Sequence, residues 1–352
     1  ILESQLTTLD TSQWETVDIP HDFQISQPWV KPDESEKMVH LDGASFRTHL
    51  SGRGFKEMGV CWYVKTYTPA SVLDGKRILI DFEGIMYVGD VYLNGERIGG
   101  TDYGYLGFEV DLSKKLHYGK PNVIAVRAST GEPMNSRWYT GGGIYRDVHL
   151  VVTNAGLYFA RHPLYITTTD NKYVNLQVEV VNQPGEENVT LETIIKDSQG
   201  SIIYQKRETC PFFSPVEAHD LGRIPSNEID WEPIALDNPQ LWSCENPYLY
   251  TAEVTLYNKD GEPVDHTYQH FGVRTVEINP SFGLKLNGRK VLLKGNANHH
   301  TLGALGAAAY PRAMEKRIKL LKEFGCNHIR TSHNPYSCLL YTSPSPRDTE
   351  RS

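Results

Sequence analysis

Two short polar stretches hold the residues whose types and spacing could do chemistry. They lie in NANHH and IRTSHNP, and they are Asn298, His299, His300, Arg330, Ser332, His333 and Asn334. Each stretch directly follows a segment expected to be a parallel strand. Ligands of α/β folds bind at the carboxyl ends of such strands, so both stretches should lie at the same end of the sheet and face the same binding site. From position alone two interpretations stand: loop ends that water solvates, or a binding site.

A metal site is not predicted from these residues. His299 and His300 are adjacent, so their side chains point in different directions, and they lack the i, i+4 spacing of a helical zinc motif. The sequence also has no nucleophile elbow, phosphate-binding loop or dinucleotide-binding fingerprint. The sequence therefore predicts no cofactor.

A second unusual stretch is MNSRWYTGGGIYRDVHL, which places Arg137, Trp138 and Tyr139 before three glycines. Aromatic faces pack against the C–H faces of sugars, and an arginine can donate to hydroxyl groups. A plug at a domain interface would use the same residue types. The two interpretations are compatible, and we expect a flexible loop here.

The elements that must position these residues begin with two β-rich segments. Between residues 62 and 152 short strands alternate with turns, and Asn94-Gly95 is a strong two-residue hairpin signal, so a jelly-roll β-sandwich is expected over residues 1–157. Strands at a spacing of about 8–12 residues continue over residues 158–275, which predicts an immunoglobulin-like β-sandwich. Asp260-Gly261 is expected to be a hairpin turn of the same kind as Asn94-Gly95.

The pattern changes in residues 276–337. A hairpin at Asn287-Gly288 leads into an apolar strand at Val291–Leu293, a helix follows from Pro311 to a glycine stop, and CNHIRTSHNP supplies a second strand. Strand, helix, strand is a βαβ unit, which is typical of a parallel sheet with helices outside it. The fold class is thus multidomain and mainly β, with an α/β segment at the end.

Composition excludes several function classes. The 352 residues carry a net charge of −8, which argues against nucleic acid as a partner. No run of apolar residues is long enough to span a membrane. The five cysteines are scattered and form neither a metal pair nor a disulfide framework. The chain starts at Ile1 without a leader, so the compartment stays open between cytoplasmic and periplasmic or secreted.

Taken together, the segments resemble glycoside hydrolase family 2, the family of β-galactosidases, β-glucuronidases and β-mannosidases. The resemblance covers about residues 14 to 337. Its most specific pieces are IPHDF, SRWYTGGGIYRDV, NPQLWSCENPYLY, FGVRTVEI, LLKGNANHHTLGALGA and CNHIRTSHNP. HHTLGALGA and RTSHNP are most similar to the β-galactosidase branch. The segment from residue 276 would then be the start of a (β/α)₈ TIM barrel.

The resemblance implies roles for individual residues. His299 and His333 match histidines that bind the sugar in the deepest subsite. Asn334 and Arg330 match residues that support the same side of that subsite. The loop of Arg137 and Trp138 matches one that reaches the active site, where some members place an aspartate and this chain has Asn135-Ser136. His300 stands where many members have glutamate.

The resemblance also implies a mechanism whose acids this chain lacks. Family members retain configuration and use two carboxyl groups about 5–5.5 Å apart, supplied by later barrel strands. From residue 277 to residue 337 the acids are Glu277, Glu315 and Glu323, and none follows a barrel strand. No catalytic residue is therefore assigned, and we expect a fragment truncated early in the TIM barrel and inactive alone.

The closing stretch, residues 338–352, is expected to be a non-native tail. It reads CLLYTSPSPRDTERS, and Pro344 and Pro346 interrupt any helix. The second barrel helix is expected to be missing here.

The function expected from the sequence is a retaining, β-galactosidase-like hydrolase of terminal β-linked sugars. Its partner would be an oligosaccharide or β-galactoside, and the full-length protein could form a homo-oligomer. Two alternatives remain open: a non-catalytic carbohydrate-binding or scaffold protein, and a β-glucuronidase or β-mannosidase.

Overall fold

The computed structural model describes residues 5–30, 38–41, 44–47, 54–131, 138–183, 188–211 and 226–342. The chain divides into two compact units. The first contains residues 1–152 together with 294–352, and the second contains residues 153–293. No helix in the described ranges is long and apolar enough to cross a membrane.

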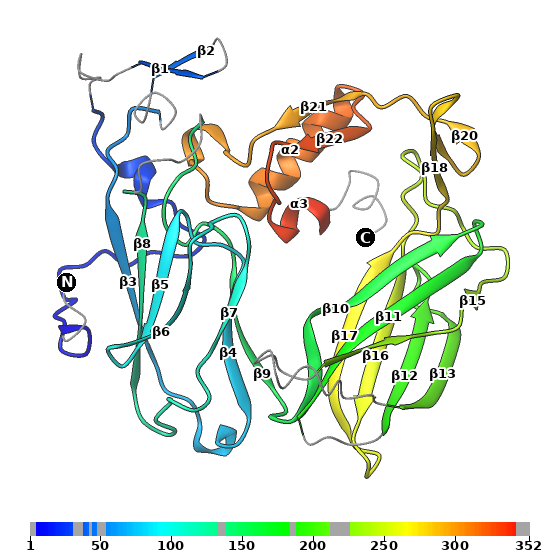
Figure 1. Ribbon diagram of the computed structural model, residues 1–352, viewed down its shortest axis with the longest axis horizontal. Helices are drawn as coiled ribbons and strands as arrows, with labels where there is room; N and C mark the ends of the chain where they lie inside the picture. Colours follow the sequence, from blue (N-terminus) through cyan, green and yellow to red (C-terminus); the bar gives the residue numbers. More distant parts are fainter. Residues whose placement is uncertain are drawn as a thin grey trace. The chain divides into compact units, whose positions relative to one another are not determined.

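The first unit contains a jelly-roll-like sandwich of two sheets, with strand orders β3-β8-β5-β6 and β7-β4-β9 (Figure 1). Its strands are β3 (Val60–Tyr67), β4 (Arg77–Phe82), β5 (Val88–Leu93), β6 (Glu96–Thr101), β7 (Phe108–Asp111), β8 (Asn122–Ser129) and β9 (Val148–Thr153). A hairpin of β1 (Met38–Leu41) and β2 (Ala44–Arg47) also belongs to this unit. Alternating apolar residues of both sheets form one core, in which the rings of Phe82 and Phe108 stack at 5.2 Å.

The turn chemistry of this sandwich follows the sequence. Asn94 and Gly95 join β5 to β6 with φ values of 51° and 89°, as a two-residue hairpin requires. In the stretch IYRDVHLVV, only the last part is a strand, because β9 begins at Val148. Of the residues before it, Tyr145 contacts His300 and Arg146 donates to the carbonyl of Pro335, whereas Ile144 packs in the sandwich core.

The second unit is an immunoglobulin-like sandwich. One sheet contains β10 (Leu157–Thr169), β11 (Tyr173–Asn182) and β14 (Ser226–Asp230), with β15 (Ile234–Ala235) also paired to β11; the other has the order β13-β12-β16-β17. The strands of the second sheet are β12 (Asn188–Lys196), β13 (Ile202–Pro211), β16 (Tyr250–Tyr257) and β17 (Pro263–Phe271). Inward-facing residues of β11, β12 and β16 build its core.

Two expectations within this unit need correction. Asp260-Gly261 is not a two-residue hairpin: the loop runs from residue 258 to 262, and only Gly261 has a positive φ. The side chain of Asn258 explains this, because its Oδ1 accepts hydrogen bonds from the backbone N–H groups of Asp260 and Glu262. The first strand, β10, was not predicted, because LYFARHPLYITTT includes a register shift between Phe159 and Leu164 that hides its alternation.

A small sheet follows, with β18 (Val276–Asn279), β19 (Gly283–Leu286) and β20 (Arg289–Lys290). The predicted turn at Asn287-Gly288 is confirmed, since both residues have positive φ. The predicted strand at Val291–Leu293 is wrong. These residues are outside the described strands and Leu292 is 73% exposed; the parallel strand β21 (Gly295–Asn298) begins later.

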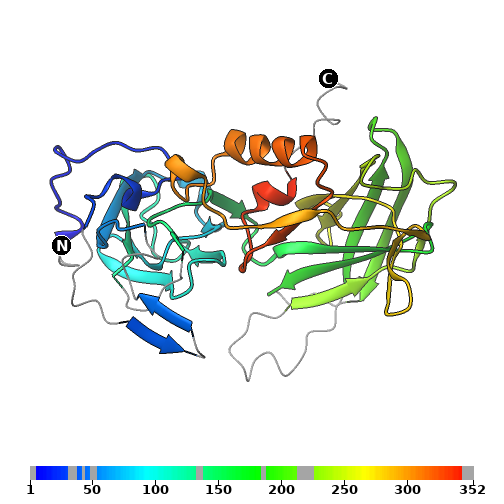
Figure 2. The same cartoon turned by 90° about the horizontal axis from the view of Figure 1, so that it is seen from above.

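The predicted βαβ motif is present, and it lies in the first of the two compact units. β21 pairs in parallel with β22 (His328–Thr331), with Asn298 opposite Thr331. Helix α2 (Pro311–Glu323) connects them and lies beside the strand pair (Figure 2). Pro311 occupies the first helical turn, and Gly325 has a positive φ after the helix, as expected.

The apolar stripe of α2 is covered only in part. Met314 is buried against Ala309, Tyr336 and Leu340, whereas Phe324 is 85% exposed. Leu340 comes from α3 (Cys338–Thr342), which corrects the expectation that no helix forms after Ser337. Leu339 and Leu340 are apolar enough to close this cluster, and the helix ends before Pro344 and Pro346, which lie outside the described residues.

The separate core of the second unit gives a testable expectation. Leu191 in β12 is fully buried, so Leu191→Ala should lower the free energy of unfolding of this sandwich by about 2–5 kcal/mol. Hydrogen exchange followed by mass spectrometry should report faster exchange in β11, β12 and β16. Ile202→Ala, at a position 54% exposed in β13, is the control and should change exchange little. Unchanged protection in the Leu191→Ala protein would contradict this account of the core.

Candidate functional site

Three aromatic rings meet at the carboxyl ends of β21 and β22. The ring centroids of His299 and His333 lie 5.9 Å apart and nearly perpendicular. The indole of Trp138 lies 4.4 Å from the His299 ring and 5.7 Å from the His333 ring. Trp138 comes from the sandwich, whereas both histidines follow the parallel strands. The fold therefore brings together three of the residues singled out from the sequence.

Two further predicted residues lie next to His333 in sequence or in space, and only Arg330 approaches a ring of the cluster. The Oδ1 atom of Asn334 accepts a 2.7 Å hydrogen bond from the hydroxyl of Tyr103. Arg330 is exposed, and its Nη2 lies 3.5 Å from Nδ1 of His333, the outer limit of a hydrogen bond. Arg137 lies outside the described residues. Tyr103 was missed, although the tyrosine-rich turn TDYGYLG after β6 was a signal that could have found it.

The cluster carries polar atoms that no other described residue satisfies. Nε1 of Trp138 and Nδ1 of His299 are inaccessible to water and have no hydrogen-bond partner in the part of the chain described here. Such atoms are rare in native proteins, because an unpaired buried polar group costs about 1–3 kcal/mol. The indole N–H is a donor only, and an imidazole nitrogen donates or accepts. Because both atoms are covered, the binding groups open to a ligand at this cluster are the ring faces and the exposed side chain of His333.

One buried carboxylate holds the loops beneath this cluster. Asp22 is 3% exposed and accepts four hydrogen bonds. Its Oδ1 accepts from the backbone N–H groups of Gln24 and Gly142, at 3.1 and 2.9 Å. Its Oδ2 accepts from the hydroxyl of Tyr139 at 2.7 Å and from the N–H of Ala307 at 2.8 Å. Asp22 thereby ties the loop of Trp138 to the segment that follows His299.

The glycines after Trp138 serve close packing here, which corrects the expectation of a flexible loop. Gly141 has a φ of +74°, and a Cβ there would lie 2.5 Å from the Cβ of Ala307 and 2.6 Å from Oδ2 of Asp22. Gly143 has a φ of +113°, and a Cβ there would lie 2.2 Å from the hydroxyl of Tyr63. Only glycine fits these positions, so the loop is constrained.

Two arginines fix the carbonyl groups of the strand-end loops. Arg146 is buried and donates through Nη2 to the carbonyl of Pro335 at 2.7 Å and through Nη1 to that of Tyr105 at 3.1 Å. Arg317, on α2, donates through Nη1 to the carbonyl of His299 at 3.0 Å and through Nη2 to that of Thr301. Both histidine-bearing loops are thus held by side chains from other elements.

His300 points away from the cluster into the protein. It is buried, and its Nε2 lies 3.0 Å from the carbonyl oxygen of Thr140. Since a carbonyl only accepts, Nε2 carries the proton and donates. Burial lowers the pKa of His300 to about 4, and the nearby Arg146 also lowers it, while the hydrogen bond to Thr140 raises it. His300 is therefore neutral at pH 7.

Asp22 and the acids of the βαβ segment are not placed as free carboxylates at the cluster of Trp138, His299 and His333. Both oxygens of Asp22 are occupied by donors. Glu315 pairs with Lys319 along α2, and Glu323 is exposed at the end of the same helix. The arrangement can bind and orient a polar ligand, but these residues cannot supply a pair of facing acids.

A different group of potential metal ligands lies in the sandwich. Glu83, Asp147 and His149 each place one ligand atom within 4.8 Å of the others. Burial raises the pKa of Asp147, and the neighbouring Glu83 raises it further. Glu83 Oε1 lies 3.7 Å from His149 Nε2, so a direct contact between these side chains accounts for the grouping without an ion. Sequence reasoning did not single out these residues.

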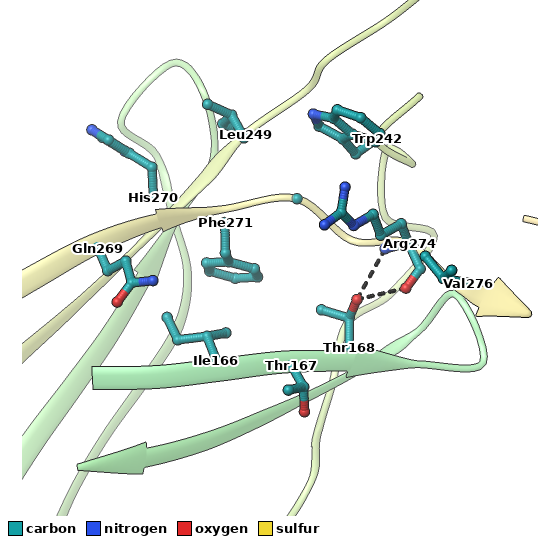
Figure 3. A pocket seen from close by; sticks show the side chains of 11 residues that line it. Ile166, Thr167, Thr168, Trp242, Leu249, Gln269, His270, Phe271, Arg274 and Val276 are labelled. Atoms are coloured by element: carbon teal, nitrogen blue, oxygen red, sulfur yellow. Dashed lines mark hydrogen bonds between the residues drawn. The ribbon is translucent and has the colours of Figure 1, made fainter. Parts of the chain in front are cut away.

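The second unit has a pocket of about 500 Å³ formed by its own residues (Figure 3). It is lined by Ile166, Thr167, Thr168, Trp242, Leu249, Gln269, His270, Phe271, Gly272, Arg274 and Val276. The guanidinium of Arg274 lies over the Trp242 ring at 4.6 Å, and a Cβ at Gly272 would lie 2.7 Å from that side chain. The indole is therefore already packed, and the lining offers no carboxylate for hydrolysis.

Consecutive family models match nearly the whole chain. Residues 10–154 match the sugar binding domain of glycosyl hydrolases family 2, residues 161–274 match the model described as glycosyl hydrolases family 2, and residues 276–343 match the TIM barrel domain of that family. The sandwich, sandwich and βαβ order is thus that of a multidomain glycosidase.

Named relatives and solved structures agree with these matches. The β-galactosidase BoGH2A of Bacteroides ovatus is 36% identical over 92% of the chain and 36% of its own length. A β-glucuronidase of Bacteroides fragilis is 28% identical over 83% of the chain and 42% of its own length. A glycosyl hydrolase family 2 member from Bacteroides cellulosilyticus superimposes with a TM-score of 0.83 at 32% identity, covering 97% of this chain and 42% of that one. The chain belongs to glycosyl hydrolase family 2, and it spans less than half the length of these relatives.

The four hydrogen bonds to Asp22 predict a large effect of its removal. Asp22→Ala should lower the free energy of unfolding of the first unit by about 3–5 kcal/mol, because buried donors lose a charged acceptor. Asp22→Asn should cost less, since its amide oxygen can still accept from Gln24 and Gly142. Urea unfolding measures both, with the exposed Asp18→Ala as control. Equal stability of Asp22→Ala and Asp18→Ala would contradict the assigned role.

The pKa of His300 predicts a dependence of stability on pH. The folded-state pKa of about 4 is below the ordinary value of 6.5, so between these two values the unfolded chain binds more protons. Stability should therefore fall as the pH drops through this window, by up to about 3 kcal/mol. The titratable and charged groups that face this imidazole are Tyr105, Tyr145, Arg146, His299 and Arg317.

His300→Gln isolates this contribution because its amide does not titrate. Urea unfolding at pH 7.0 and pH 4.5 should show the wild-type chain losing more stability than the variant. Parallel losses in the two proteins would contradict the assignment.

Proposed function

We propose that this chain forms the sugar-binding wall of a retaining, β-galactosidase-like glycoside hydrolase that removes terminal β-linked sugars from oligosaccharides. The observation that carries the proposal is the meeting of Trp138, His299 and His333 at the carboxyl ends of two parallel barrel strands. Barrel enzymes bind substrates at this end of the strands.

The chemistry of the three rings supports a sugar as the ligand. The indole of Trp138 offers an apolar face, which suits the C–H face of a pyranose. His299 and His333 add imidazole nitrogens on the neighbouring sides, and Asn334 is held beside them by Tyr103. A ligand bound here meets one apolar platform and several directional polar groups, the usual composition of a small-molecule site.

The residues described here would bind and orient the sugar without cleaving it. Retaining hydrolysis needs one acid to protonate the leaving oxygen and one carboxylate to attack the anomeric carbon, about 5–5.5 Å apart. Asp22, Glu315 and Glu323 are not placed for either role. In the proposed enzyme the rest of the barrel supplies that pair, and the 352-residue chain by itself binds the ligand but does not turn it over.

A galactoside is the favoured ligand, because BoGH2A, a named β-galactosidase, is the more similar of the two relatives compared above. The named β-glucuronidase keeps a glucuronide as the second candidate. A non-catalytic carbohydrate-binding protein could use the same sugar-binding wall. It differs from the proposed enzyme because no pair of catalytic carboxylates would be present in the full-length protein.

The binding test uses a non-hydrolysable aryl thio-β-galactoside and isothermal titration calorimetry on the 352-residue chain. We expect Trp138→Ala, His299→Ala and His333→Ala each to weaken binding about tenfold or more, which corresponds to about 1.4 kcal/mol. His117→Ala, at an exposed sandwich position, is the matched control and should bind as the wild type does. Thioglucuronide and thiomannoside analogues separate the alternative sugars.

Absence of binding to all three analogues by the wild-type chain would overturn the proposed wall. Hydrolysis of an aryl β-galactoside by the purified chain, lost in His299→Ala and His333→Ala, would contradict the proposed inactivity.

A further inference from the structure

The adjacent histidines at the end of β21 have opposite surroundings. His299 faces Trp138 and His333, and its Nδ1 has no partner among the described residues. His300 is buried on the other side of the backbone, against the sandwich. The proposed sugar-binding role uses only His299, so His300 needs a separate explanation.

The partner of His300 is part of the loop that carries Trp138. Its Nε2 donates to the carbonyl of Thr140, a fully buried residue 160 positions earlier in the sequence. Thr140 is separated from Trp138 only by Tyr139, so fixing this carbonyl restricts where the indole can lie. The end of β21 thus places His299 against the indole of Trp138. The next residue, His300, holds the backbone that carries this indole.

The imidazole of His300 is itself held firmly. The ring of Tyr105 meets it edge-on at 5.4 Å, and the ring of Tyr145 lies at 5.6 Å. The hydroxyl of Tyr145 donates to the carbonyl of Gly104 at 2.9 Å. The backbone carbonyl of Tyr145 accepts a hydrogen bond from the N–H of Ala309. A donor that cannot move is an effective anchor, because little entropy is lost when its hydrogen bond forms.

We propose that His300 is a positioning residue whose hydrogen bond to Thr140 sets the indole of Trp138 against His299 and so forms the sugar-binding wall. The expected effect of His300 on sugar affinity rests on the proposed function. Its expected effect on the position of the Trp138 indole does not. Asp22 fixes the same loop through Tyr139 and Gly142, so His300 decides the orientation of a loop that is already attached.

Two amide substitutions test the reach of the side chain while keeping it polar. His300→Gln places its amide nitrogen near the position of Nε2, so it can still donate to Thr140. His300→Asn is one methylene shorter, so its amide nitrogen falls near the position of Nδ1 and cannot reach that carbonyl. The pair thus differs mainly in whether the hydrogen bond is made.

The first readout is the indole N–H signal of Trp138 in a ¹H–¹⁵N spectrum of the sugar-free 352-residue chain. Its absence from the spectrum of Trp138→Phe identifies it. We expect His300→Gln to keep the signal near its wild-type position and His300→Asn to shift or broaden it. The indole signal of Trp231, a residue of the other sandwich, should stay unchanged in both variants and checks that the chain is folded.

The second readout is the affinity for the thio-β-galactoside. We expect His300→Gln to bind within about twofold of the wild type and His300→Asn to bind about fivefold or more weakly, a loss of about 1 kcal/mol. If the wild-type chain binds no sugar, the proposed function fails while the indole comparison still decides the role of His300. A wild-type indole signal in His300→Asn, or equal shifts in both variants, would overturn the inference. If His300→Asn does not fold, His300→Leu replaces it as the variant without a donor.

Discussion

The site depends on one buried negative charge. A carboxylate removed from water is strongly unfavourable unless hydrogen bonds replace its hydration, and Asp22 has four of them. The donors come from its own turn, from the loop after Trp138 and from the segment after His299. None of these segments can move away without leaving the charge unsolvated, so Asp22 joins the sandwich to the start of the barrel.

This constraint explains the small residues packed around it. Gly141, Gly306 and Ala307 crowd against the carboxylate of Asp22, and a Cβ at either glycine would lie within 2.6 Å of its Oδ2. The backbone must approach closely for its N–H groups to reach the oxygens, and larger side chains would hold it away. The sequences IPHDF, YTGGG and LGALGA are thus three parts of one contact, although they are far apart along the chain.

In the proposed enzyme, binding and bond cleavage are supplied by different parts of the architecture. The sandwich contributes an aromatic platform, and the first two barrel strands contribute imidazole and amide groups that suit hydroxyls. Groups of this kind stabilise a bound sugar without taking part in proton transfer or nucleophilic attack. Arg146 and Arg317 hold the loop carbonyls on both sides, so the polar groups are arranged before any ligand arrives.

The sequence by itself determined the local features. Alternating apolar residues gave most strands of both sandwiches, and the helix signals gave α2. Asn94-Gly95 gave a turn of the first sandwich and Asn287-Gly288 gave a turn of the small β18–β20 sheet. Each of these features depends on neighbouring residues. The resemblance of whole motifs pointed to His299, His333 and Trp138.

Only the tertiary structure decided how those residues are used. It buried His300 while leaving His299 at the site, engaged both oxygens of Asp22 and recruited Tyr103. It also closed the cluster around Met314 with Leu340 from a stretch where the prolines had argued against a helix. These outcomes depend on contacts between residues far apart in the chain, whose burial and hydrogen bonding no local pattern specifies.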